Sequence, residues 1–295
     1  MSASAPHSIL AWAGGIAGIV EAIVVQPLEL IKVRFQLNHG NNPSITSCAR
    51  DIIAEGGPSR LFRGLLPELV GMFPTRSVMY SSNELAKRIM LGSDNVSGER
   101  EEEKQVTASI VALSGAFSGV AEAAVVTPFQ VVKVRLQAKQ HLGKYRNSFD
   151  CVQKVLREEG ILAFSNGMPA TIGRNSIFNC VYFTVMYKIK EVSPKPDDSK
   201  FKSTLHSLVT GFIGGVAATM CNAPFDVVKS RIQAQCPSNI EYTSTLQALT
   251  TIGRTEGPTA LYKGFQPKAL RMGIGAAVAV TVFEAVCEIA RELNM

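Results

Sequence analysis

The stretch VVQPLELIKVRFQ, residues 24–36, combines apolar residues with a proline and regularly spaced polar side chains. On an α-helix, which turns by about 100° per residue, Glu29, Lys32 and Gln36 fall on one face. The polar side chains therefore form a stripe along an otherwise hydrophobic helix. A single copy of this pattern would be explained by an i,i+3 surface pair, with Pro27 opening the helix.

The pattern, however, occurs three times. VVTPFQVVKVRLQ (residues 125–137) and CNAPFDVVKSRIQ (residues 221–233) place a proline, a lysine, an arginine and a glutamine at the same offsets. The three prolines lie about one hundred residues apart, which is the signature of tandem structural repeats. We therefore divide the chain into three repeats, residues 1–100, 101–200 and 201–295.

Each repeat combines a long apolar segment, a polar stretch that ends in a glycine, and a second apolar segment. Glycine pairs in the long segments have the spacing that lets membrane helices approach closely: Gly14 and Gly18, Gly115 and Gly119, and Gly211 and Gly215. A soluble helical-repeat scaffold is the alternative, but VTGFIGGVAATMCNAPF (residues 209–225) is not amphipathic toward water. The prediction is an all-α membrane protein with six spans across ~30 Å of hydrocarbon. The helices are expected near residues 8–37, 67–90, 107–138, 168–190, 204–235 and 267–292.

The composition supports a polar membrane interior. Hydrophobic residues make up 46% of the chain, and the mean hydropathy is only +0.14 because ionisable residues interrupt the long segments. Inside a membrane such residues face a bundle interior or a water-filled cavity. The net charge of +6 comes from bases scattered at helix ends without interleaved aromatic residues, which favours anionic lipid over nucleic acid.

No pattern indicates an enzyme or a metal site. The four histidines and six cysteines have neither zinc-ligand nor catalytic spacing, so the cysteines are expected to be mostly small hydrophobic residues, and no cofactor is expected. The amino-terminal residues MSASAPHS lack the pattern of a cleavable signal peptide, so any targeting signal is expected to be internal.

Three copies of a Pro-x-acid-x-x-Lys-x-Arg signature, the second with glutamine at the acidic position, are each followed by a glutamine. They resemble the mitochondrial carrier family over essentially the whole chain. The resemblance implies six helices with threefold pseudosymmetry in the inner mitochondrial membrane, with both termini in the intermembrane space. It further implies a monomer that exposes a central site to one side at a time. Cardiolipin is the expected lipid partner.

The resemblance also implies a gate on the matrix side, in which the acid of one repeat pairs with the lysine of the next. Glu29 would pair with Lys133, and Asp226 with Lys32. The third pair is incomplete, because Gln130 replaces the acid that would face Lys229. The glutamines expected to brace this layer are Gln36, Gln137 and Gln233.

A second gate is expected at the cytosolic ends of the shorter helices, where the match to the family pattern is partial. Glu84 would pair with Lys190, and Glu284 with Lys87. Tyr187 replaces the acid of the second repeat, and Cys287 occupies the basic position of the third.

The substrate site should lie where the three repeats differ, because gates are threefold-like and a substrate is not. Seven residues after the turn glycines stand Gly71, Arg174 and Arg271, and four residues after them stand Glu68, Thr171 and Lys268. Each cation, Lys268 above all, has an alternative interpretation as a snorkelling or gate-supporting residue. The fork of an arginine matches a carboxylate through two hydrogen bonds, and two anchors at different depths favour an anion with two carboxylates. Asn175 is a donor suited to a keto oxygen.

Within the family, segments such as MPATIGRNSIFNCVYF (residues 168–183) look most like the branch that carries 2-oxodicarboxylates. The resemblance implies exchange of 2-oxoadipate and 2-oxoglutarate. A carrier of citrate or of other di- or tricarboxylates, or a proton-leak carrier, remains an alternative. Glu21 and Glu122 are either counterions for cavity bases or proton sites. Glu68 has the same two interpretations, and it could instead repel a third carboxylate.

Overall fold

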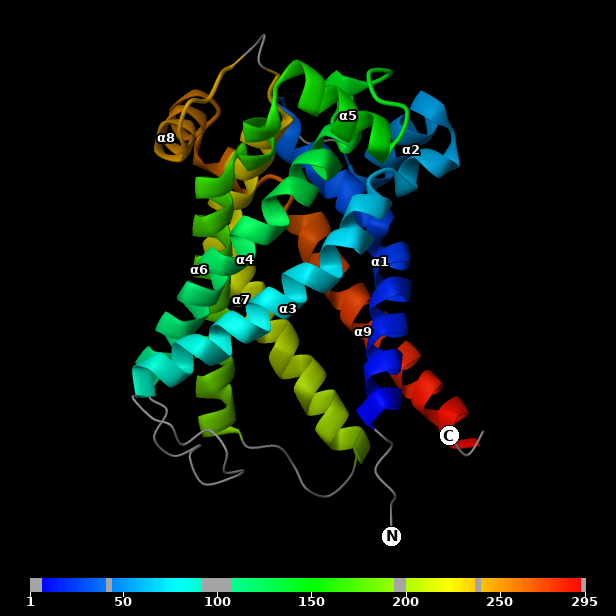
Figure 1. Cartoon of the computed structure of the whole chain (residues 1–295), viewed down its shortest axis with the longest axis vertical. Helices are drawn as coiled ribbons and strands as arrows, with labels where there is room; N and C mark the ends of the chain where they lie inside the picture. Colours follow the sequence, from blue (N-terminus) through cyan, green and yellow to red (C-terminus); the bar gives the residue numbers. More distant parts are fainter. Residues whose placement is uncertain (1–6, 41–43, 92–107, 194–199, 237–239, 293–295) are drawn as a thin grey trace.

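The protein is a bundle of long helices with short helices at one end (Figure 1). The computed structural model describes residues 7–40, 44–91, 108–193, 200–236 and 240–292. The six predicted long helices are present, with ends within a few residues of those expected. They are α1 (His7–Leu37), α3 (Leu65–Leu91), α4 (Ala108–Gln137), α6 (Met168–Val192), α7 (Lys200–Ala234) and α9 (Phe265–Glu292).

The long helices have membrane-spanning dimensions. The shortest, α6, has 25 residues, and at 1.5 Å per residue it extends over about 37 Å, more than the hydrocarbon thickness. By length and composition alone, three described segments are apolar enough to span: Ala112–Gln137, Val209–Ala234 and Pro258–Ala290. Large apolar side chains such as Phe73 and Ile89 are exposed, as expected of a surface that contacts lipid.

The six helices form a closed ring in which each packs against the next, in the order α1, α3, α4, α6, α7, α9 and back to α1. The ring needs small residues where two backbones approach. A Cβ at Gly119 would lie 2.6 Å from the backbone nitrogen of Ser176, so only glycine allows α4 to pack this closely on α6. At Gly14, by contrast, a Cβ would meet nothing within 4 Å, so the predicted close approach is absent there.

The polar stretch of each repeat contains a short amphipathic helix that the sequence patterns did not reveal. These helices are α2 (Ile45–Gly56), α5 (Ser148–Glu158) and α8 (Thr245–Thr255). Each begins at an N-cap, Ser44, Asn147 or Ser244, whose side chain accepts a hydrogen bond from a backbone N–H. Each is followed by a 3₁₀ turn, η1 (Pro58–Phe62), η4 (Ile161–Ser165) or η5 (Pro258–Tyr262), and η3 (Lys139–His141) follows α4.

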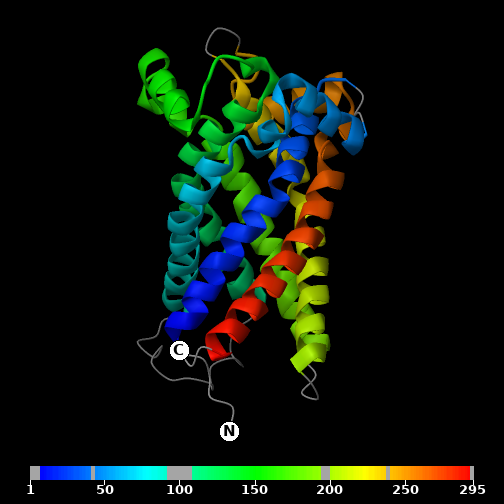
Figure 2. The same ribbon diagram turned by 90° about the vertical axis from the view of Figure 1, so that its right-hand side faces the viewer.

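The amphipathic helices bury their apolar faces against the long helix of their own repeat. Ile52 packs in a cluster with residues of α1, Val155 with residues of α4, and Ile252 with residues of α7. All three helices lie at one end of the bundle, opposite the end where α1 begins and α9 ends (Figures 1 and 2). Cys48 and Cys151 belong to these clusters, and burial raises the pKa of their thiols to about 11 and about 12, as expected of cysteines that act as small hydrophobic residues.

In all three repeats, the same kind of ion pair joins the amphipathic helix to the long helix. The arginine of each signature, Arg34, Arg135 or Arg231, donates two hydrogen bonds to a glutamate that follows the amphipathic helix or lies at its end. The glutamate partners are Glu55, Glu159 and Glu256. Two parallel bonds to one carboxylate are the strongest geometry for such a pair.

The glycine that starts the second helix of each repeat packs against the next repeat. Gly64, Gly167 and Gly264 have φ values of 87°, 75° and 85°, in the left-handed region that favours glycine. Their Cα atoms lie against Gln137, Gln233 and Gln36, respectively. The brace glutamines therefore act as packing partners of these turns, which joins the three repeats in a cycle.

We predict that Gly264→Ala destabilises the protein more than Gly143→Ala. Both glycines have positive φ, but a Cβ at Gly264 would lie 3.0 Å from Gln36 Cγ and 3.1 Å from the Lys32 carbonyl, whereas one at Gly143 meets nothing within 4 Å. The control therefore carries the backbone strain alone, and the Gly264 variant should lose about 2–4 kcal/mol in total. Thermal unfolding in detergent measures both variants. Equal losses would show that the contact with α1 is unimportant.

We also predict that Glu256→Gln loses stability in a pH-dependent way. Burial acts to raise the pKa of Glu256, but hydrogen bonds from Arg231 and Lys263 outweigh it and lower the pKa to about 2. The ion pair thus contributes fully above the ordinary glutamate pKa, and its contribution is lost as the pH falls toward 2. The variant should lose about 1–3 kcal/mol at pH 7, and the difference should shrink below about pH 4.5.

The control for this prediction is Glu158→Gln. Glu158 pairs with Lys144, but its side chain is 49% exposed, so its removal should change the melting temperature little. A difference between wild type and Glu256→Gln that is independent of pH from 7 to 3 would contradict the assignment.

Candidate functional site

Three largely buried carboxylates from different helices form the centre of a polar cluster inside the ring. They are Glu29 of α1, Glu68 of α3 and Asp226 of α7. Each contacts at least two cations, and most of these cations come from other helices. The cluster therefore links all three repeats.

Glu29 and Glu68 share their cations. Lys133 Nζ lies 3.2 Å from Glu29 and 2.7 Å from Glu68, so the predicted contact between Glu29 and Lys133 is present and a second acid joins it. Arg271 Nε lies 3.2 Å from the other oxygen of Glu29, and Arg271 also reaches Glu68 at 3.6 Å. Glu68 is thus held between two cations of the other repeats, which favours its interpretation as a counterion over that of a free repelling charge.

Asp226 is surrounded in the same way. Lys268 Nζ lies 2.5 Å from its carboxylate and 3.0 Å from the side-chain oxygen of Asn222. Arg174 approaches Asp226 at 3.8 Å and Lys32 at 4.0 Å, the latter being the expected contact. Lys32 also lies 3.6 Å from Glu29, so it connects the two halves of the cluster.

The third predicted contact is absent. Lys229 donates no side-chain hydrogen bond to any described residue, and Gln130 Oε1 is buried without a hydrogen-bond partner among the described residues. The third pair, which the sequence predicted to be incomplete, thus has no hydrogen bond between Lys229 and Gln130 in this conformation. The neutral amide of Gln130 attracts Lys229 only weakly, because it carries no charge. Asp226 attracts the lysine, and Arg174, Lys32 and Lys133 repel it, so these charges dominate its surroundings.

Positive charge is in excess within the cluster. The only carboxylates within ion-pairing distance of its described cations are Glu29, Glu68 and Asp226, while a fourth acid, Glu21, acts on Arg271 from farther away. The cations are Lys32, Lys133, Arg174, Lys229, Lys268 and Arg271. Buried charges of one sign require counterions, so this arrangement can bind an anion.

The two arginines are the cations best placed to meet a ligand. The Arg174 and Arg271 side chains are 19% and 28% exposed, whereas those of Lys133 and Lys268 are 11% and 10% exposed. Arg174 donates to the side-chain oxygen of Asn175. Arg174 Nε and Asn175 Nδ2 are buried donors that have no acceptor in the described part of the chain, so both are available to a bound group.

Gly71, the remaining residue predicted for this site, has a packing role instead. It is buried, and a Cβ there would lie 2.8 Å from the ring of Phe129. The absence of a side chain lets α3 approach α4 at this position.

Glu21 and Glu122 lie at the helix interfaces. Glu21 Oε1 is 2.8 Å from the position that a Cβ of Gly275 would take, so Glu21 fits against α9 only because that residue is glycine. Glu122 accepts a long hydrogen bond of 3.5 Å from Asn179 of α6. The position of Glu21 near Arg271 supports its interpretation as a counterion.

The brace glutamines differ in their hydrogen bonds. Gln36 Oε1 accepts from Ser230 at 2.7 Å, and Gln137 Nε2 donates to the Arg63 carbonyl at 3.1 Å. Gln233 is fully buried, yet neither of its amide atoms has a hydrogen-bond partner within the described ranges. The brace glutamine of the third repeat therefore lacks the side-chain hydrogen bond that those of the first two repeats make.

The cytosolic gate stays a prediction, because the lysine side chains of both expected pairs lie outside the described part of the structure. Glu84 is exposed and pairs with Arg88 of its own helix at 3.4 Å, and no described residue pairs with the exposed Glu284. Tyr187 is half-buried, while the side chains of Lys87 and Lys190 lie outside the described part. In Figure 1, α3 and α9 end on opposite sides of the molecule, at the end away from the amphipathic helices.

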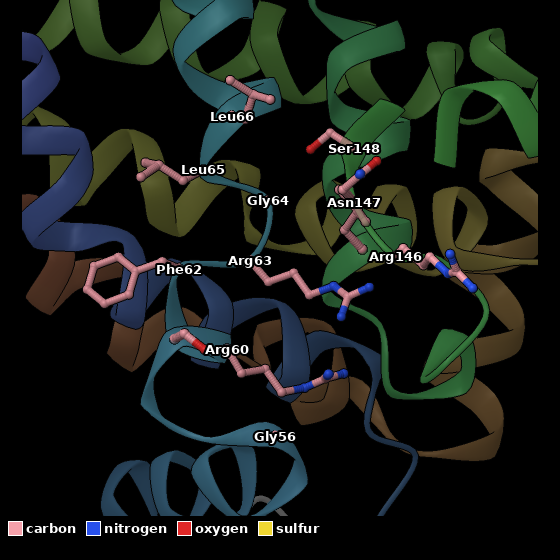
Figure 3. A pocket seen from close by; sticks show the side chains of 12 residues that line it. Gly56, Arg60, Phe62, Arg63, Gly64, Leu65, Leu66, Arg146, Asn147 and Ser148 are labelled. Atoms are coloured by element: carbon pink, nitrogen blue, oxygen red, sulfur yellow. The ribbon is translucent and has the colours of Figure 1, made fainter. Parts of the chain in front are cut away.

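A cavity of about 380 Å³ lies outside the ring, between the first and second repeats (Figure 3). It is lined by Arg60, Arg63 and Arg146 and by the first residue of α5, Ser148. Figure 3 shows the Arg63 side chain extending from its turn toward the start of α5. Arg63 Nε is buried there without a hydrogen-bond partner in the described chain.

Within the described residues, no three histidine, cysteine, aspartate or glutamate side chains form a group that could hold a metal ion. The arginine–glutamate pairs at the amphipathic helices were not predicted from the sequence. Their signal was present, since each repeat has a glutamate just before the glycine that starts the 3₁₀ turn or one residue further upstream.

Comparisons with known proteins agree with the repeat structure. The family model described as "Mitochondrial carrier protein" matches residues 4–94, 104–196 and 200–293. A probable mitochondrial 2-oxodicarboxylate carrier of Schizosaccharomyces pombe is 36% identical over 96% of this chain and 94% of its own length. The mitochondrial citrate transporter D of Aspergillus niger is likewise 36% identical, over 96% of this chain and 94% of its own.

A mammalian relative shows similar coverage: the mitochondrial 2-oxodicarboxylate carrier of Mus musculus is 35% identical over 92% of this chain and 91% of its own length. The family model matches all three repeats, and the relatives are similar over nearly their full length, so the family of this chain is established. The chain belongs to the mitochondrial carrier family and is a multi-pass membrane transporter rather than an enzyme.

Proposed function

We propose that this protein exchanges 2-oxodicarboxylates, such as 2-oxoadipate and 2-oxoglutarate, across the inner mitochondrial membrane by alternating access. The observation that carries the proposal is the excess of cations over carboxylates in the buried cluster. The names of the relatives from Schizosaccharomyces pombe and Mus musculus support the same substrate class.

Two separate anchors suit a dicarboxylate. Arg174 lies on α6 beside Asp226, and Arg271 lies on α9 beside Glu29 and Glu68. Each guanidinium can hold one carboxylate through two parallel hydrogen bonds. Asn175 Nδ2, a buried donor that lacks an acceptor in the described chain, is suited to the 2-oxo oxygen.

The same contacts would couple binding to opening. In this conformation the ion pairs close the end of the ring that carries α2, α5 and α8, which we take as the matrix side. A substrate carboxylate on Arg174 competes with Asp226, and one on Arg271 competes with Glu29 and Glu68. Substrate binding therefore weakens the contacts that close the gate, as alternating access requires.

Citrate or another tricarboxylate is the second candidate. The cluster has enough positive charge to accept a third carboxylate, and the relative from Aspergillus niger bears the name of a citrate transporter. Glu68 does not bar a third carboxylate by itself, because Lys133 and Arg271 already bind it. A proton-leak function is less favoured, since Glu21 is attracted by Arg271, which can balance its charge from beyond ion-pairing distance.

We further propose that the cavity shown in Figure 3 binds an anionic lipid headgroup, with cardiolipin as the partner. Its three arginines supply positive charge, and the N-terminal end of α5 adds backbone N–H groups and the favourable end of the helix dipole. The carrier itself is proposed to act as a monomer, without a nucleic-acid partner.

We predict that purified protein in liposomes loaded with 2-oxoglutarate takes up labelled 2-oxoadipate and 2-oxoglutarate in preference to citrate, malate and nucleotides. The two anchors and the keto donor favour these anions over dicarboxylates without a keto group. Uptake into liposomes without internal substrate is the control for strict exchange. Preferred uptake of a nucleotide would overturn the proposed substrate class, and preferred uptake of citrate would favour the second candidate.

A second prediction concerns the anchors: Arg174→Ala and Arg271→Ala should each abolish exchange while the protein remains folded. Each change removes a charge-assisted contact of about 1.5–3 kcal/mol with the substrate. The Arg174→Lys variant should recover little activity, because an ammonium cannot make two parallel bonds to one carboxylate. Exchange rates in liposomes and melting temperatures in detergent are measured together. Exchange by Arg174→Ala with wild-type rate and apparent affinity would show that the site lies elsewhere.

A further inference from the structure

Lys229 differs from the two lysines that occupy the equivalent positions in the other repeats. Lys32 and Lys133 each lie within 4.0 Å of two carboxylates. Lys229 is only 7% exposed, yet it makes no ion pair with the described residues and donates no side-chain hydrogen bond to them. It is therefore a buried cation without a direct counterion.

The surroundings of Lys229 increase the need for a counterion. Arg174, Lys32 and Lys133 are close enough to repel it electrostatically. Asp226 attracts it, but that carboxylate is already shared by Lys268, Arg174 and Lys32. Burying a cation among other cations is costly unless an anion arrives.

Unused donors of α6 lie near the turn of α7 that carries Lys229. Arg174 approaches Asp226, three residues before Lys229 on α7, at 3.8 Å, and it donates to Asn175. Arg174 Nε is buried without an acceptor among the described residues. Asn175 Nδ2 is likewise buried and has no acceptor among the described residues. Two helices, α6 and α7, thus bring together three donor groups whose acceptors do not come from the described protein.

We infer that Lys229 is a substrate anchor, which holds one carboxylate of the transported anion together with Arg174. The ligand thereby supplies the carboxylate that the second repeat lacks, because Gln130 stands where the sequence pattern would place an acid. This inference rests on the proposed exchange of 2-oxodicarboxylates. It makes Lys229 a residue that determines affinity, rather than a member of the gate.

The two roles predict different kinetics. If Lys229 served only the gate, its removal would break no contact seen here, and the KM for substrate would stay unchanged. If it anchors substrate, Lys229→Gln should raise the KM for 2-oxoglutarate by about 10-fold or more, the effect of losing one charge-assisted contact. Gln130→Glu should also raise the KM, because a glutamate at 130 would occupy Lys229 in place of the substrate.

The experiment measures KM and maximal rate for 2-oxoglutarate exchange in liposomes with wild type, Lys229→Gln, Lys229→Arg and Gln130→Glu. Lys229→Arg keeps the charge and should stay within about threefold of the wild-type KM. Melting temperatures with and without 2-oxoglutarate provide a readout that does not depend on transport. The ligand should stabilise wild type and Lys229→Arg, but stabilise Lys229→Gln much less, while unliganded Lys229→Gln should be at least as stable as wild type because a repulsion is removed.

The outcomes separate the two proposals. If wild-type protein neither exchanges nor is stabilised by 2-oxoglutarate, the proposed function is wrong and the inference falls with it. If wild type exchanges 2-oxoglutarate while Lys229→Gln keeps the same KM and the same stabilisation by ligand, the function stands and Lys229 is not an anchor. A Gln130→Glu variant with a lower maximal rate but an unchanged KM would likewise assign this pair to the gate.

Discussion

Sharing of a few buried carboxylates among a larger number of cations is the interaction on which the rest of this structure depends. Glu29, Glu68 and Asp226 are each contacted by more than one base, and some of these bases contact two acids. Charges buried in a membrane protein must be compensated, so the cluster holds the six helices together at one level. Because compensation is incomplete, the cluster keeps the excess positive charge on which the proposed anion site depends.

The structure contains two kinds of ion pair with different tasks. Arg135 with Glu159 and Arg231 with Glu256 join elements of the same repeat through two parallel hydrogen bonds, which fixes each amphipathic helix to its long helix. Most pairs of the central cluster join different repeats, through single contacts of 2.7–4.0 Å. Rigid repeats with weaker contacts between them are what a transporter needs if it opens by moving repeats relative to one another.

Site and gate are one network rather than two layers. Asp226 contacts Lys32, which belongs to the expected gate, and also Arg174 and Lys268, which were expected to bind substrate. A ligand carboxylate can therefore act on the gate by direct competition for the same cations, without a relay through the backbone. The departure from threefold symmetry at Gln130 and Lys229 lies inside this network, at the level where a substrate would act.

Sequence alone determined the three repeats, the six long helices and the residues that share a face, because these follow from spacing along one helix. It also indicated the contacts of Glu29 with Lys133 and of Asp226 with Lys32, through the resemblance to a known family. The amphipathic helices could have been found from their N-cap residues, Ser44, Asn147 and Ser244, and from the glutamate that follows each helix or closes it.

Only the tertiary structure decided which charged groups meet. Glu68 binds Lys133 and Arg271, Gly71 packs on Phe129, and Gln130 does not bond to Lys229. These contacts join residues far apart in the chain, and they depend on the tilt, register and separation of helices to within about an ångström, which periodicity does not specify. The conformation matters as well, since the end of the ring that is closed determines which predicted ion pairs can form.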